Sequence, residues 1–399
     1  MKKQYIIYFL VIISVSSWAQ KDPRLKVPCT DAIAQNVDGK WIKTADQGSV
    51  TSKECYNRLY AIHELILKIY PEPKGVDAAW HRQAGVSYFG AKRKYYKTSD
   101  DRLTFEYLST PHFLQFSYTA GFFAYRCDYT DKTILIPGYP GETGTWLNII
   151  ANKNIGDPGA DDTWTINGLP VMTKKPAQYK EDGYEFYYPE PDRNVRGALV
   201  YRKGGLMPYR TVSRKQYLEY CISYHTKIFD EMIKGIEQMP VRSAAEQESE
   251  KNTQLVRLQK QFANDEKKLK ANVDYYLSGY KTDQQIRADQ VANMKLNKEQ
   301  ELKKFSDEME KSKDEGKLNE PAMIKVMYSS TPAIFETDPA WGQLIIIENP
   351  DYIRKDLPKH VPQLIEINLV WNTGGAREKF ANIFLESFPT DKLQAMIDK

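Results

Sequence analysis

The chain has 399 residues, of which 56 are Lys or Arg and 52 are Asp or Glu, so its formal net charge is +4 at pH 7. This near balance excludes the strongly basic surface of a typical nucleic-acid-binding protein, and we expect no nucleic-acid partner. The length exceeds what one hydrophobic core usually holds, which predicts two or more structural units.

The first 19 residues have the pattern of a cleaved export signal. Two lysines precede an apolar run from Tyr5 to Val15, and small side chains follow at Ser17 and Ala19. The run is about half as long as the roughly 20 residues that a transmembrane helix needs. We therefore predict a signal peptide over residues 1–19 and a protein exported to the periplasm or outside the cell. No transmembrane segment is expected after signal removal.

Four cysteines in an oxidising compartment permit two disulfides. Cys127 alternates with tyrosines along an expected strand, and Cys221 lies on the apolar stripe of an expected helix. Both are interpreted as buried small hydrophobic residues. Cys29 and Cys55 lie in less regular surroundings and are the candidate pair for a disulfide. The wide spacing of all four is unlike that of a zinc site, and no metal is expected.

The first predicted helix spans residues 51–70. Thr51 and Glu54 have the spacing of a capping box, and apolar residues then recur at helical intervals as far as Ile69. Pro71 ends the pattern. We expect one amphipathic helix that packs against another element.

From residue 86 to residue 203 the hydrophobic period changes to two. Segments rich in β-branched and aromatic residues, such as VSYFG, LTFEYL and GALVYRK, are separated by Gly, Pro, Asp and Asn. Because strands follow strands with no helix between them, we predict a mostly antiparallel sheet, strongly twisted or partly closed, with packed helices.

A second helix is predicted to begin at Ser213. Ser213 and Gln216 form a capping-box pattern, and apolar residues follow at helical spacing until Pro240. Arg210, Ser213 and Arg214 are also a candidate anion site, because the free backbone N–H groups at a helix start attract anions. The alternative interpretation is ordinary solvated charge around a helix cap.

Residues 243–318 contain few Gly or Pro and are rich in charges of both signs. Leu255, Phe262 and Leu269 recur every seven residues, and a second apolar stripe follows a capping box that starts at Thr282. We predict an antiparallel, coiled-coil-like hairpin of two long helices, with these three residues facing the partner helix. The alternative is a charged, partly disordered linker.

The β pattern returns after Pro321, and an amphipathic segment closes the chain. These late strands need partners, and the simplest arrangement has them join the earlier sheet. This predicts one α+β body formed by residues 20–242 and 319–399, with residues 243–318 inserted as a helical arm.

Common catalytic signatures are missing: the chain has no nucleophile elbow, phosphate-binding loop or dinucleotide fingerprint, and we expect no cofactor. His63 begins a short HELIL match to a zinc-protease helix but lacks the second histidine four residues later. The acidic stretch 156–164 is interpreted as a polar turn because it does not match a calcium-binding loop.

A run of aromatic residues near residue 186 is the last candidate. It could stack on sugar rings or line a groove, although strands are also rich in aromatic residues for packing reasons. The members of this candidate aromatic surface are Tyr184, Phe186, Tyr187 and Tyr188.

These observations favour a non-catalytic exported protein, periplasmic or surface-associated, that binds a protein or envelope partner through residues 243–318. A first alternative is a periplasmic hydrolase of glycan or peptide that uses loop carboxylates, such as Asp100 with Asp101 or Glu181 with Asp182. A second alternative is a carrier of a small apolar ligand inside a curved sheet.

Overall fold

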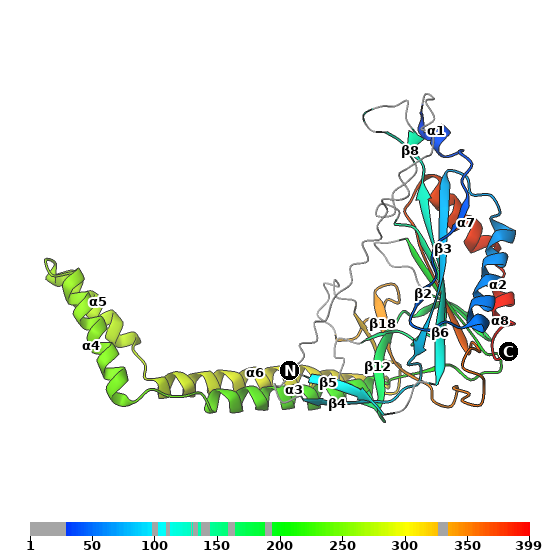
Figure 1. Cartoon of the computed structure of the whole chain (residues 1–399). Helices are drawn as coiled ribbons and strands as arrows, with labels where there is room; N and C mark the ends of the chain where they lie inside the picture. Colours follow the sequence, from blue (N-terminus) through cyan, green and yellow to red (C-terminus); the bar gives the residue numbers. More distant parts are fainter. Residues whose placement is uncertain are drawn as a thin grey trace. The chain divides into compact units, whose positions relative to one another are not determined.

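The computed structural model describes residues 29–97, 103–108, 112–128, 130, 135–136, 144–158, 164–187, 194–325 and 334–399. These residues form a mixed α+β structure with eight helices and a large sheet (Figure 1). The chain divides into two compact units. The first unit comprises Met1–Arg210 and Asp338–Lys399, and the second, which we call the helical unit, comprises Thr211–Thr337. The predicted signal peptide lies outside the described residues.

The first unit is built on a nine-stranded sheet. Its strands lie in the order β1 (Trp41–Lys43), β3 (Val76–Ser87), β6 (Phe113–Ala124), β9 (Trp146–Ala151), β19 (Leu364–Val370), β15 (Val195–Tyr201), β14 (Tyr184–Tyr187) and β13 (Ala177–Glu181), with β2 (Gln47–Gly48) also paired to β3. In this sheet β1 and β2 run parallel to β3, and the other neighbouring strands pair antiparallel. The prediction of a mostly antiparallel sheet, completed by a late strand, is therefore confirmed.

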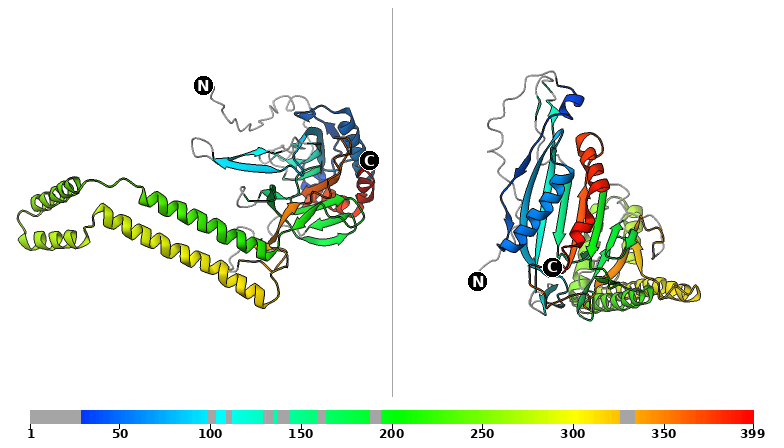
Figure 2. Two further views of the ribbon diagram at one scale, coloured as in Figure 1. Left: turned by 90° about the horizontal axis from the view of Figure 1, so that it is seen from below. Right: turned by 90° about the vertical axis from the view of Figure 1, so that its right-hand side faces the viewer.

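Helices cover one face of this sheet (Figure 2). They are α2 (Lys53–Ile69), α7 (Gly375–Ser387) and α8 (Thr390–Gln394). The apolar side of α2, with Leu59, Ile62 and Ile66, packs into the main core against alternate residues of β3 and β6. The helix begins after Ser52, whose side chain accepts a hydrogen bond from the backbone N–H of Cys55. The predicted cap at Thr51 is therefore wrong by one residue.

A second sheet packs on part of the opposite face. Its strands lie in the order β10 (Asp157–Pro158), β12 (Leu169–Lys174), β18 (Gly342–Glu348) and β16 (Tyr209–Thr211), with β11 (Thr165–Ile166) also paired to β12. A second apolar core, including Met172, Leu199, Ile346 and Tyr352, fills the space between the two sheets. Two short hairpins, β4 (Arg93–Lys97) with β5 (Leu103–Tyr107) and β7 (Arg126–Cys127) with β8 (Leu135–Ile136), complete the strands of this unit.

The cysteine pairing differs from the prediction. A disulfide joins Cys29, just before α1 (Asp31–Ala34), to Cys127 in β7, with the two Cα atoms 5.5 Å apart. Cys55 is a free thiol because it lies on the buried face of α2. The predicted Cys29–Cys55 bond and the interpretation of Cys127 as an unpaired core residue are therefore wrong. Cys221 is free and buried, as expected.

The helical unit consists of α3 (Arg214–Glu237), α4 (Ala244–Gln261), α5 (Glu266–Gly279), α6 (Asp283–Asp314) and the short strand β17 (Met323–Lys325). Helices α3 and α6 lie side by side (Figures 1 and 2). The His225 ring lies 5.0 Å from the Phe305 ring, and the Lys298 ammonium lies 2.6 Å from the Asp230 carboxylate.

The division of residues 243–318 into two long helices is wrong. The segment contains three helices, because α4 ends at Gln261 and Phe262 is its C-cap residue. Leu255 and Leu269 consequently lie on different helices, and the heptad pattern through Phe262 does not form one continuous seam. The long partner of α6 is α3, which the sequence pattern had assigned to the α+β body.

Candidate functional site

Ser213 lies at the start of α3 and forms a complete capping box. Its side-chain oxygen accepts a hydrogen bond from Gln216 N at 3.2 Å, and Gln216 Oε1 accepts one from Ser213 N at 3.0 Å. Arg210 forms an ion pair with Asp351. The Arg214 guanidinium lies 3.3 Å from Glu320 Oε2. Both arginines therefore have a carboxylate partner, and the bound anion stays a prediction.

The candidate aromatic surface is divided by the alternation of a strand. Tyr184 and Phe186 in β14 pack against the main core, on the side of the helices. Tyr187 points to the opposite face and packs against the second core. Tyr188 lies outside the described residues. The described aromatic residues therefore lie on both faces of the sheet and do not form one surface.

A buried ion pair lies on the same face as Tyr187. The Lys174 ammonium is 2.8 Å from Glu185 Oε2, and the Tyr209 hydroxyl donates to Glu185 Oε1 at 2.5 Å. Burial raises the pKa of Glu185, but the charge and hydrogen bond of Lys174 and the bond from Tyr209 outweigh it, so the net pKa is lowered. Burial lowers the pKa of Lys174, although Glu185 opposes this shift. The Lys174 ammonium also lies over the rings of Tyr187 and Tyr209.

A cavity of about 150 Å³ lies beside this pair, between the two sheets, and both apolar residues such as Ile155 and Leu199 and polar residues line it. Its wall includes Lys153, Glu366 and Asn368, and Lys174 reaches it from β12. Lys153 Nζ donates to Glu366 Oε1 at 3.2 Å, and Asn368 Nδ2 donates to the same oxygen at 2.5 Å. With this lining, the cavity does not favour an apolar ligand.

No sequence motif singles out these residues, although two of them leave a trace in the sequence. Glu185 is a lone carboxylate between Tyr184 and Phe186, and Lys174 ends a strand in which every residue is buried. A charged residue inside such a strand must find a partner, because an unpaired buried charge is very costly. The partner's identity depends on register across the sheet, which no local pattern contains.

Two further titratable side chains are buried in the first unit. His63 Nδ1 lies 3.1 Å from the Tyr118 hydroxyl, and its ring stacks on Trp80 with the centroids 3.9 Å apart. Burial lowers the pKa of His63 to about 4. Glu348 accepts hydrogen bonds from the backbone N–H groups of Gly90 and Ile155. Burial raises the pKa of Glu348 to about 7 despite these bonds.

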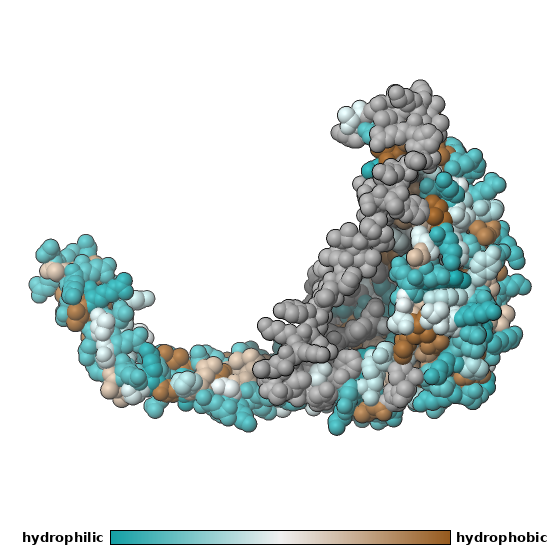
Figure 3. All heavy atoms as spheres, in the orientation of Figure 1, coloured by the Kyte–Doolittle hydropathy of each residue, from teal (hydrophilic) through white to brown (hydrophobic). Residues whose placement is uncertain are grey.

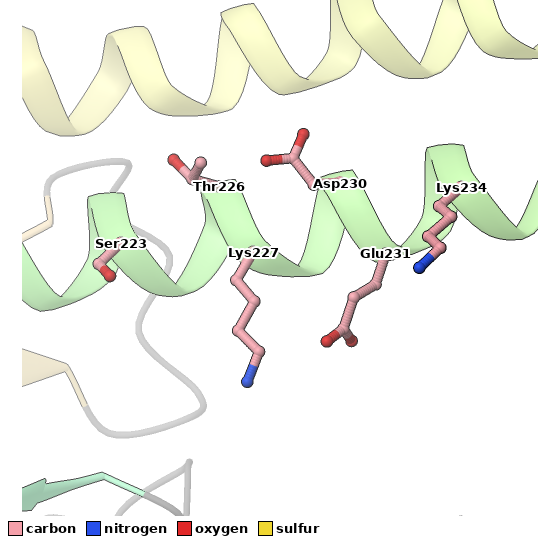
Figure 4. Close-up of a pocket in the computed structure, with 6 residues that line it drawn as sticks. All are labelled: Ser223, Thr226, Lys227, Asp230, Glu231 and Lys234. Carbon is pink, nitrogen blue, oxygen red and sulfur yellow. The ribbon is translucent and has the colours of Figure 1, made fainter.

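Figure 4 shows a shallow surface depression along α3. Thr226 and Asp230 point toward α6, whereas Lys227 and Glu231 point away from it. All the lining residues come from this one helix, so no second element closes over the depression. The arrangement is typical of a solvated helix face.

Within the helical unit, α4 and α5 form a pair of their own. Its apolar residues Leu255, Leu269, Val273 and Tyr276 are only half-buried. No residue of α5 is buried. Figure 3 shows that apolar side chains reach the surface of this pair among charged ones. The pair therefore presents apolar surface that its own packing leaves partly uncovered.

A polar junction connects this pair to α6. The Arg242 guanidinium donates two hydrogen bonds to the Asp283 carboxylate, at 2.9 and 2.6 Å. Gln247, the buried residue of α4, donates to Arg242 O and accepts from Asp283 N. The Tyr280 hydroxyl donates to Gln247 O at 3.2 Å. Hydrogen bonds from Arg242 lower the pKa of Asp283 to about 2. The junction fixes how α4 begins relative to α6.

The described residues provide no obvious hydrolytic pair. Glu181 accepts a hydrogen bond from the Tyr179 hydroxyl at 2.8 Å, and Asp182 accepts from Gly204 N at 2.9 Å. Both carboxylates therefore stabilise local turns and strands. Asp100 and Asp101 lie outside the described residues, as do Asp161 and Asp162 of the acidic stretch. The hydrolase stays an alternative prediction.

Within the described ranges, no helix combines the length and apolar character needed to cross a bilayer. The same residues contain no group of three or more His, Cys, Asp or Glu side chains placed to hold a metal ion. No protein-family model matches the chain, and no curated protein or solved structure is significantly similar to it.

Proposed function

We propose that this protein is a non-catalytic exported binding protein, and that the α4–α5 pair of its helical unit docks onto a protein partner. The partner presents an amphipathic helix that covers the apolar side chains of the pair. The observation that carries this proposal is the lack of any buried residue in α5.

Helix α5 has 14 residues, a length at which an isolated helix is marginal in water. Helices in proteins are stabilised mainly by burying an amphipathic face. Here Leu269 and Val273 are half-buried, and Tyr275 is 81% exposed. A partner that buried these side chains would supply the stabilisation that α4 alone does not give.

The exposed surface of α4 supports a helical partner. It carries the short side chains Ala245, Ser249 and Val256 along one face, so that another backbone can approach closely. Acidic residues gather in the first turns of α4, and basic residues follow toward its end. A partner helix that runs antiparallel and has the same charge order would place opposite charges together.

The disulfide supports the exported location. Disulfides persist in oxidising compartments and are rare in the cytosol of most cells. The Cys29–Cys127 bond closes a chain segment with a sequence separation of 98, so its formation strongly restricts the unfolded chain.

The test compares two variants, each of which replaces one exposed apolar residue by glutamate. Val256 on α4 and Met232 on α3 are each 47% exposed, so Val256→Glu and Met232→Glu introduce the same charge at equal exposure. Wild type and both variants are expressed in the producing cells, and their partners are cross-linked and identified by mass spectrometry. Sedimentation of the purified chain then shows whether the partner is a second copy of this chain. We expect Met232→Glu to keep the wild-type cross-linked partner and Val256→Glu to lose it. Equal cross-linking of both variants would contradict the proposal.

A further inference from the structure

One row of paired residues crosses five strands on the face of the large sheet that points away from the helices. It consists of His81, Thr119, Asn148, Asn368 and Gly197, which are successive cross-strand partners. Their neighbours in sequence, such as Leu147, Ile149 and Ile367, point into the main core. We call these five residues the polar row.

The polar row has unused hydrogen-bonding capacity. In the part of the chain that the structure describes, the side chains of His81, Thr119 and Asn148 make no hydrogen bond to protein. All three are half-buried. Asn368 donates to Glu366, while its own side-chain oxygen accepts no hydrogen bond from the described residues. None of these polar atoms is among the buried, unpartnered side-chain atoms of the described residues. They are therefore in reach of solvent and can bond a polar ligand in place of water.

Two aromatic rings border the row, each placed over a glycine. A Cβ atom on Gly121 would lie 2.7 Å from the Trp146 ring, and a Cβ atom on Gly197 would lie 2.7 Å from the Tyr187 ring. Any larger residue would displace these rings. Trp146 precedes Asn148 by two positions in β9, and Tyr187 lies at the β15 end of the row. The Lys174 ammonium already lies over the Tyr187 ring, so of these two rings Trp146 is the flat apolar surface that the row offers to a ligand.

The charged groups beside the row already have partners, and Glu185 is shared between Lys174 and the exposed Lys180, whose ammonium lies 3.2 Å away. Lys153 pairs with Glu366 at 3.2 Å, and Lys174 pairs with Glu185 at 2.8 Å. Burial lowers the pKa of His81, which favours its uncharged form. A ligand with a net charge would have to compete with these pairs, which favours an uncharged ligand.

We infer that the polar row binds an uncharged carbohydrate chain. Sugar hydroxyls donate and accept hydrogen bonds, and amide and hydroxyl side chains do both. Aromatic rings offer flat apolar surfaces for the C–H faces of sugar rings. From His81 to Asn148 the row covers two strand spacings of about 4.8 Å, roughly 10 Å in total. Its Asn368–Gly197 end continues into the cavity of about 150 Å³ between the two sheets. This inference uses the first unit alone and is independent of the function proposed for the helical unit.

The test is calorimetric titration of the full chain with three uncharged hexasaccharides: cellohexaose, maltohexaose and chitohexaose. Hexagalacturonate is the charged comparison, and an uncharged unstructured hexapeptide is the peptide comparison. The variants are Asn148→Ala and Thr119→Val, which remove unused polar groups without breaking a described hydrogen bond. Asn297→Ala, on the exposed surface of α6, is the matched control. Thermal melts followed by tryptophan fluorescence verify folding.

We expect saturable binding of at least one hexasaccharide, weakened at least tenfold in Asn148→Ala and unchanged in Asn297→Ala. Thr119→Val should weaken the same binding in a chain with an unaltered melting temperature. The inference is overturned if none of the three hexasaccharides binds, if the row variants bind as tightly as wild type, or if the hexapeptide or hexagalacturonate binds more tightly.

Discussion

Two buried side chains, His63 and Glu348, should make the free energy of unfolding of the first unit depend on pH, with opposite signs. The pKa of His63 is about 4 in the folded chain and 6.5 in an unperturbed histidine, so between these values the unfolded state binds more protons. Its contribution to the free energy of unfolding therefore falls as the pH falls. The pKa of Glu348 is about 7 against an ordinary 4.5, so the folded state binds more protons and the contribution rises as the pH falls.

The two contributions are similar in size. For each group, the difference between the folded and ordinary pKa corresponds to about 3 kcal/mol at full extent. Roughly 2 kcal/mol of this is realised between pH 7 and pH 5 for each residue, with opposite signs. The pair therefore nearly cancels in the wild type, and removing either member reveals the other.

Urea unfolding at several pH values between 7 and 5, followed by tryptophan fluorescence, measures this effect. Residues 211–337 contain no tryptophan, so the signal reports the first unit alone. Relative to wild type, Glu348→Gln should lose about 2 kcal/mol of unfolding free energy from pH 7 to pH 5, and His63→Gln should gain about 2 kcal/mol. Each substitution also has a pH-independent cost, so the slope against pH is the quantity to compare.

The exposed Glu72 provides the control, because Glu72→Gln makes the same carboxylate-to-amide change as Glu348→Gln on the surface of the same unit. Profiles for Glu348→Gln and His63→Gln that run parallel to the wild-type profile would refute the reasoning. Such a result would mean that neither side chain changes its proton affinity on folding.

Three further predictions concern single residues. Cys55→Ala, unfolded without reductant, should show one free thiol to a chromogenic reagent, and more than one would contradict the disulfide assigned here. Ser213→Ala should destabilise α3 by about 1 kcal/mol, as measured by circular dichroism, whereas Ser213→Asp should not, because a carboxylate also caps a helix. If phosphate instead stabilises the wild type saturably and Ser213→Asp loses this effect, the result would support an anion site. Glu185→Gln should cost about 3–5 kcal/mol in urea unfolding, because it leaves the Lys174 ammonium buried without a counter-charge. Adding Lys174→Met should recover part of that loss, and a double variant as unstable as Glu185→Gln alone would contradict the pairing.

Features that depend on neighbours in sequence were the ones that the sequence predicted well. The capping box at Ser213 needs only four residues, and α3 begins there as expected. The late strand near residue 367 was expected in the earlier sheet because strands need partners, and it lies between β9 and β15. Local signals and pairing requirements thus sufficed for the α+β class.

Features that depend on contacts between distant residues could not be predicted. Cys29 could pair with any of three cysteines, and only the fold brings it to Cys127 while α2 buries Cys55. The heptad through Phe262 indicated helical structure correctly, but the break after Gln261 was not recognised. The polar row combines residues from five strands whose register is fixed by the whole sheet, so no single segment contains its signal.

The central position of β19 in the large sheet matters while the chain is being synthesised. Its residues are synthesised after the whole helical unit, yet the strand lies between β9 and β15. Until the ribosome has passed Val370, β9 and β15 each lack this neighbour and leave an edge that another chain could pair with. The contacts between α4 and α5 are close in sequence and can form during this interval. A premature stop before Leu364 would therefore yield a chain with two open strand edges in the middle of its sheet, and a nascent chain that stalls there is at greatest risk of aggregation.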